Sequence, residues 1–334
     1  MQTTLGDDRL HATIRSTFVK HTMKIRHLSH DGRSIRISTP AKLNLHFELL
    51  KKRGDGFHEI ETVMSTVSLF DELQFSVRND GLLQLNIVQE GCTASESIPD
   101  DERNLILQAM SRLKARHGTA DLGCDVFLRK RIPSAAGLGG ASGNAAGALL
   151  AANWIWKLGL EPSQLDSVAA EIGSDIPFFF RGGTCRCTGR GEKIEQIDVP
   201  AGMAIVIAKP MEGLSTAAVY GQCSVPPQPN SADRILQHLQ TGSWNKVGDQ
   251  LFNRLEEFAM SMTPAIGKLK NLFDRLECVG HQMSGSGSSY FGIFRNAADA
   301  QRAAKIATLE TDNTIFACST LSREGTFEAT VEAG

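Results

Sequence analysis

Residues 131–153, "RIPSAAGLGGASGNAAGALLAAN", decide the fold of this chain, because an uncharged run so rich in glycine has few structural explanations. No charged residue occurs from Ile132 to Trp156, a run long enough to cross a bilayer, which takes about 20 residues. Its first half, however, is mostly glycine, serine and alanine, and after Ile132 its only large apolar side chain before Leu149 is Leu138. The run is therefore not a membrane span.

The segments on either side of this run indicate what it does. "CDVFLRK" (124–130) has the pattern of a strand, and a helix is expected from near Gly140 through Trp156. A strand, a glycine loop and a helix N-terminus together form an anion site, because free N–H groups and the helix dipole converge there. Ser142 would lie in the first turn, where its hydroxyl can cap the helix or reach a phosphate or its metal ion.

Two common phosphate motifs do not fit the loop. A P-loop requires a lysine directly after its glycines, and none follows here. The dinucleotide fingerprint requires a third glycine, where this chain has Ser142. The alternative to a phosphate cradle is a glycine turn followed by a helix of small residues packed tightly against a neighbour.

Composition limits the possible functions. The 334 residues suffice for two ordinary domains or one large one, and 41% apolar with 22% charged residues is typical of a globular protein. A net charge of −2 provides no general attraction to nucleic acid or to a membrane surface, so an anionic ligand needs a local site. Seven scattered cysteines favour a reducing compartment without disulfides, and Cys185 and Cys187 are expected at alternating strand positions. We expect a cytoplasmic bacterial protein, with a plastid less favoured, as a monomer or homodimer.

The first 33 residues differ from the rest. They contain no apolar segment typical of a secretory signal, and their basic residues are accompanied by Asp7 and Asp8, which argues against a transit peptide. We expect a disordered extension, or a start codon assigned too early, with Met23 as another candidate start.

Strands and helices are mixed without strict alternation, which predicts an α+β fold. A strand pattern begins at Ser34 and is interrupted by Pro40, which indicates two short strands or one bent one. Further strands are expected at 72–77, 82–88, 124–130, 193–199, 203–210, 279–283, 290–294 and 314–320. Helices are expected at 101–118, 140–156, 161–173, 231–240, 244–258, 264–277 and 297–308.

Four segments together carry a family resemblance. They are "STPAKLNLHFELLKKRGDGFHEI" (38–60), "PSAAGLGGASGNAA" (133–146), "GSDIPFFFRGGTCRCTGRGEKIE" (173–195) and "MSGSGSSYFGIF" (283–294). They resemble the motifs of the GHMP kinases, the superfamily of galactokinase and the homoserine, mevalonate and phosphomevalonate kinases. The resemblance covers the chain from about residue 38 to the last strand.

The resemblance implies two domains and one reaction. It implies an N-terminal ATP-binding and catalytic domain (34–195) like domain 2 of ribosomal protein S5, and a ferredoxin-like C-terminal domain (196–334). It is strongest to the members that use ATP to phosphorylate the 2-hydroxyl of 4-diphosphocytidyl-2-C-methyl-D-erythritol, a precursor in the non-mevalonate isoprenoid pathway. Mg²⁺ is implied by ATP chemistry, without an identifiable metal ligand. Alternatives are another acceptor (mevalonate, homoserine or a sugar) or a catalytically silent member.

The resemblance also implies roles for individual residues. Asp175 is the expected general base, and Lys42 beside it would keep Asp175 charged and offset charge during transfer. Phe57 and His58 of "DGFHE" would receive the cytosine by stacking and hydrogen bonding, with Asn44 and Tyr220 assisting. Backbone groups at Gly285 and Gly287 would contact substrate phosphates. The expected ATP-binding residues are Pro133, Gly137, Leu138, Gly139, Gly140, Ser142, Gly143 and Asn144. Relatives often have a serine where this chain has Gly143.

Overall fold

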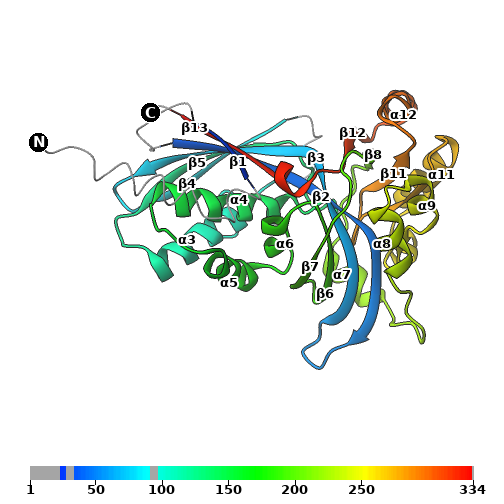
Figure 1. Ribbon diagram of the computed structural model, residues 1–334, viewed down its shortest axis with the longest axis horizontal. Coiled ribbons are helices and arrows are strands. Elements are labelled where there is room, and N and C mark those ends of the chain that lie inside the picture. Colours follow the sequence, from blue (N-terminus) through cyan, green and yellow to red (C-terminus); the bar gives the residue numbers. More distant parts are fainter. Residues whose placement is uncertain (1–22, 28–33, 91–96, 333–334) are drawn as a thin grey trace, which may run out of the picture.

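The computed structural model describes residues 23–27, 34–90 and 97–332, which form two sheets covered by helices (Figure 1). Within these residues the first sheet has nine strands in the order β1–β13–β2–β3–β5–β4, with β6 attached to β3, β7 to β6, and β9 to β2. The strands are β1 (Met23–His27), β2 (Ser34–Lys52), β3 (His58–Arg78), β4 (Leu83–Gln89), β5 (Gly123–Lys130), β6 (Thr184–Gly189), β7 (Lys193–Ile197), β9 (Phe252–Asn253) and β13 (Phe327–Glu332).

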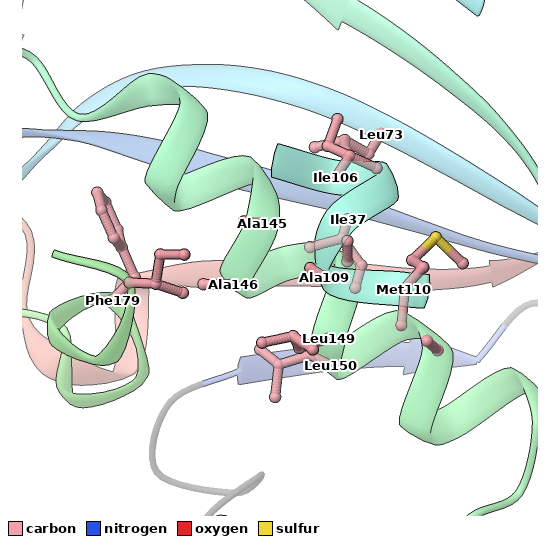
Figure 2. Packing of buried hydrophobic residues seen from close by; sticks show 14 of the residues in the cluster. Ile37, Leu73, Ile106, Ala109, Met110, Ala145, Ala146, Leu149, Leu150 and Phe179 are labelled. Carbon is pink, nitrogen blue, oxygen red and sulfur yellow. The ribbon is translucent and has the colours of Figure 1, made fainter. Parts of the chain in front are cut away.

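Four helices lie together on one face of this sheet (Figure 1). They are α3 (Leu105–His117), α4 (Gly140–Ile155), α5 (Pro162–Ile172) and α6 (Ile176–Arg181). Figure 2 shows α4 packed closely against α3 and against Ile37 of β2. The approach is close because α4 consists of small residues: a Cβ added at Gly147 would lie 2.5 Å from Cγ2 of Thr39. The second part of the glycine-rich run is therefore a helix of small residues packed tightly against its neighbours. This is the arrangement that the sequence predicted as the alternative to a phosphate cradle.

The second sheet is antiparallel, in the order β10–β11–β8–β12. Its strands are β8 (Ala204–Lys209), β10 (Gly280–Met283), β11 (Tyr290–Phe294) and β12 (Thr314–Ser319). The helical segments of this half are α7 (Thr216–Gln222), α8 (Asp233–Gln240), α9 (Trp244–Asp249), α10 (Glu256–Met262), α11 (Pro264–Arg275) and α12 (Ala297–Glu310). The short 3₁₀ turn η1 (Arg323–Gly325) lies against β1 of the first sheet. The predicted α+β class is confirmed.

The strand expected to bend at Pro40 is one long strand, β2, whose register with β3 shifts between Pro40 and Ala41. Proline lacks the N–H that a regular ladder uses, and a bulge accommodates it. Cys185 and Cys187 are both buried at alternating positions of β6, as predicted. Burial raises the pKa of Cys185 to about 12. None of the helices described is long and apolar enough to span a bilayer.

One predicted helix is wrong. The segment 244–258 is not continuous: α9 ends at Asp249, β9 follows, and α10 begins at Glu256. The helix pattern fails because Phe252 and Asn253 pair with β2, and the Asn253 side chain accepts a hydrogen bond from Leu255 N at 3.0 Å. Asparagine competes with the helix in this way through bonds from its side chain to nearby backbone.

The structure also departs from the predicted division at residue 195. The last strand, β13, pairs with β2, so the C-terminal end of the chain returns to the first sheet. β7 continues to Ile197, two residues beyond the predicted boundary. Residues 23–27 of the extension expected to be disordered form β1 beside β13, and its other residues lie outside the described part of the chain.

Candidate active site

A cleft of about 440 Å³ lies where the two halves of the molecule meet. The first half lines it with the glycine loop before α4 and with residues of β2 and β3, including Lys42 and Asn44. The second half lines it with Leu214, Thr216 and Tyr220, and with residues 285–287 of the loop between β10 and β11. Both glycine-rich loops found in the sequence therefore face one cleft.

The first glycine loop is shaped for close approach. Gly137 and Gly139 have φ of 71° and 68°, in the left-handed region that favours glycine. A Cβ added at Gly139 would lie 2.8 Å from Cγ of Lys42. Gly143 N donates to Gly139 O at 2.9 Å as the first bond of α4, so the N–H groups of residues 140–142 have no acceptor within the helix. These free donors and the helix dipole make the loop an anion site.

Most of the predicted ATP-binding residues line the cleft. These are Pro133, Gly137, Leu138, Gly139, Gly140 and Ser142. The N-cap residue of α4 is Gly139 rather than Ser142.

Gly143 and Asn144 differ from the expectation, because they face the protein interior. The Gly143 N–H is used within α4, and the Asn144 Oδ1 accepts a hydrogen bond from the Thr39 hydroxyl at 2.6 Å. A Cβ at Gly143 would lie 2.9 Å from Pro40 O, so the close approach of β2 explains why this position is glycine rather than serine.

Lys42 and Asp175 come together although they are far apart in the sequence. Lys42 Nζ lies 3.8 Å from Asp175 Oδ2, with side chains 6% and 36% exposed. Lys42 Nζ also donates to Asn44 Oδ1 at 2.5 Å, and Lys42 N donates to Leu138 O at 2.9 Å. Asp175 immediately precedes α6 but makes no capping hydrogen bond, so its carboxylate is available to a ligand in the cleft.

Burial lowers the pKa of the Lys42 ammonium, and the Asp175 charge only partly opposes this shift. If charged Lys42 is required, kcat should fall at alkaline pH with a midpoint below about 10.4, where an unperturbed lysine titrates. The measurement is a pH profile of kcat. In Lys42→Arg the residual activity should lose this alkaline limb, because guanidinium stays charged throughout the range. An unchanged limb in that variant would assign the titration to another group.

The predicted base-binding residues are only partly brought together. The Tyr220 ring lines the cleft, and its centroid lies 5.7 Å from that of His58. Burial and the nearby Lys52 charge lower the pKa of His58, which leaves its ring neutral at pH 7. Phe57 lies outside the cleft lining: its side chain is 56% exposed beneath the Arg190 guanidinium, 5.2 Å from the ring centroid.

Sequence reasoning missed several residues of the cleft. Arg190 lies in the turn between β6 and β7, and Lys130 at the end of β5 pairs with buried Asp71 at 2.8 Å. Thr62 accepts a hydrogen bond from Asn44 Nδ2 at 2.8 Å and so fixes the Asn44 amide. Arg190 belongs to "GRGE" within the segment 173–195 that carries the family resemblance, so the sequence could have identified it. Lys130 and Thr62 had no local signal, because strand pairing brings them to the cleft.

The fold and the paired Lys42 and Asp175 beside a phosphate-type loop define a small-molecule kinase, and comparisons with known proteins agree. Residues 104–183 match the family model described as "GHMP kinases N terminal domain", and residues 235–309 match "GHMP kinases C terminal".

Curated relatives narrow the class. A 4-diphosphocytidyl-2-C-methyl-D-erythritol kinase of Brevibacillus brevis is 39% identical over 270 residues, which span 80% of this chain and 90% of the relative. That of Shouchella clausii is 39% identical over 268 residues, spanning 80% and 88%. The chain belongs to the 4-diphosphocytidyl-2-C-methyl-D-erythritol kinase family, within the GHMP kinases.

Solved structures agree with this assignment. A crystal structure of 4-(cytidine 5'-diphospho)-2C-methyl-D-erythritol kinase superposes with a TM-score of 0.72 at 29% identity, covering 86% of this chain and 99% of that one. A homoserine kinase from Cytophaga hutchinsonii superposes with a TM-score of 0.69 at 18% identity, covering 90% and 99%, and shows the shared fold alone.

Proposed function

We propose that this enzyme transfers the γ-phosphate of ATP to the 2-hydroxyl of 4-diphosphocytidyl-2-C-methyl-D-erythritol. The observation that carries the proposal is the Lys42–Asp175 pair, which faces the same cleft as the anion-binding start of α4. Phosphoryl transfer requires a protein mainly to position the reactants and to stabilise charge. The Lys42–Asp175 pair and the start of α4 are suited to both tasks.

Asp175 would accept the proton of the attacking hydroxyl. Its carboxylate is partly exposed to the cleft and is not used as a helix cap, so it can approach a substrate oxygen. Lys42 is nearly buried between Asn44 and Asp175, and its ammonium would stabilise the charge that develops on the transferred group. The buried setting strengthens this effect, because less water screens the charge.

ATP would place its phosphates against the free N–H groups at the start of α4. Mg²⁺ keeps several waters and phosphate oxygens and needs only one or two protein oxygens, and the Ser142 hydroxyl in the cleft lining suits that role. When bound, the ion would neutralise phosphate charge.

The cytosine end of the acceptor is proposed to bind beside Tyr220. The Tyr220 ring offers a stacking surface, and the neutral His58 ring in contact with it can both donate a hydrogen bond to a pyrimidine edge and accept one from it. Phe57, which lies outside the cleft lining, remains a predicted contact.

ADP release with ATP and Mg²⁺ tests the proposal when the cytidyl acceptor is compared with mevalonate and homoserine. Turnover with the cytidyl acceptor alone is the expected result. Turnover with another acceptor instead would retain the phosphoryl transfer and refute the cytosine site. The absence of turnover with all three acceptors would contradict the proposed function as a whole.

A further inference from the structure

The second glycine loop, residues 284–289, controls the surroundings of Lys42. The Ser284 hydroxyl donates to Gly137 O at 3.0 Å and accepts from Asn44 N at 3.3 Å, which ties this loop to the first one and to β2. Gly285 lies so close that an added Cβ would be 2.9 Å from Asn44 Oδ1 and 3.4 Å from Lys42 Nζ. A shift of Gly285 would therefore displace the Lys42 ammonium or its partner amide.

Asn253 holds this loop from behind. Its side-chain Nδ2 donates two hydrogen bonds, to Met283 O and Gly285 O, each 2.8 Å long. Its Oδ1 accepts from Leu255 N at 3.0 Å. Both N–H donors of this amide are thus used on carbonyl groups on either side of Ser284, and the side chain is buried, which makes the arrangement specific to an amide.

Asn253 is itself held in place, because each of the three residues that follow it, Arg254 to Glu256, is bonded to or packed against the rest of the protein. Arg254 makes two 2.8 Å hydrogen bonds to the fully buried carboxylate of Glu48. Glu256 accepts from Met283 N at 2.9 Å and from the Tyr290 hydroxyl at 3.0 Å. Leu255 is fully buried. The segment 253–256 therefore forms a rigid support for the start of the second glycine loop.

We propose that Asn253 is a positioning residue for phosphoryl transfer, which holds Gly285 so that Lys42 and Asn44 keep their reactive arrangement. Asn253 lies outside the cleft lining and acts through the loop. The inference rests on the proposed phosphoryl transfer but not on the identity of the acceptor.

Asn253→Asp tests this inference, because aspartate keeps the shape and the acceptor for Leu255 N but replaces the two donors with an oxygen facing two carbonyl groups. We expect kcat to fall about 10- to 100-fold, with smaller changes in the KM values, since a misplacement near 1 Å can cost 100-fold.

Asn104→Asp is the matched control. Like Asn253, Asn104 accepts from a backbone N–H two residues further on, that of Ile106 at 3.0 Å, and it donates to Pro99 O at 2.7 Å, but it lies outside the cleft. Asn104→Asp also replaces a donor with an oxygen that faces a backbone carbonyl group, and it should keep wild-type kcat. Equal losses of kcat in the two variants, or a folded Asn253→Asp with wild-type kcat, would refute the inference.

Amide hydrogen exchange over residues 283–289 gives a readout independent of turnover. Exchange should be faster in Asn253→Asp than in Asn104→Asp, and equal rates would overturn the inference. If the wild-type protein releases no ADP with any acceptor, the proposed function fails while the exchange result still decides whether Asn253 holds the loop. If the wild type turns over and Asn253→Asp is unaffected, only the positioning role fails.

Discussion

Replacing Asp175 with asparagine should lower kcat by about 100- to 10,000-fold, the usual contribution of a general base. The substitution keeps the size and the hydrogen-bonding shape of the side chain but removes its ability to accept the proton of the attacking hydroxyl. The KM values should change far less, because asparagine has the same shape and Asp175 makes no capping hydrogen bond that the change would break. Steady-state ADP release with the preferred acceptor measures both parameters.

Asp166→Asn provides a matched control. Asp166 is also a partly buried aspartate with a cationic partner, Arg181, whose Nη2 lies 2.6 Å from Asp166 Oδ2, but it lies outside the cleft. This variant should keep kcat near that of the wild type. If kcat of Asp175→Asn is less than tenfold below that of the wild type, Asp175 only orients Lys42 and another residue must be the general base.

The parts of the fold that the sequence predicted are those with local causes. The helices α3, α4 and α5 carry periodic apolar residues or end signals of their own, and their bounds lie within a few residues of the prediction. The helices α6 and α7 are only six and seven residues long, too short for a periodic pattern to show. Strand β13 pairs with β2 from the other end of the chain, which no local pattern reveals.

The residues of the candidate site that could be predicted from the sequence alone are those whose backbone conformation and close neighbours require glycine. Gly137, Gly139 and Gly285 have positive φ and face close neighbours, and glycine runs show such needs directly in the sequence. Lys42 and Asp175 were predictable only through family resemblance, because an isolated lysine or aspartate has no local signature. Asn253 was missed because its bonds join segments 30 residues apart in the chain.

Alanine in place of Gly137 should lower kcat/KM for ATP by about 100-fold or more, since this change displaces the first glycine loop, where the ATP phosphates are proposed to bind. Gly137 has a φ of 71°, and an added Cβ would lie only 2.1 Å from the carbonyl oxygen of Ser284. That oxygen belongs to backbone and cannot rotate away as a flexible side chain would. Relief of the clash requires the two glycine loops to separate, which breaks the Ser284–Gly137 hydrogen bond and opens the cleft beside Lys42.

Gly159→Ala separates this clash from backbone strain. Gly159 has a similar φ of 65°, but an added Cβ there would meet no atom within 4 Å. Backbone strain should therefore lower the free energy of unfolding by about 1 kcal/mol in both variants, because alanine disfavours the left-handed conformation. Only Gly137→Ala should also lose ATP affinity, measured by calorimetric titration with ATP and Mg²⁺. Equal ATP affinities in the two variants would show that the contact between the loops is not needed for nucleotide binding, and that the start of α4 suffices.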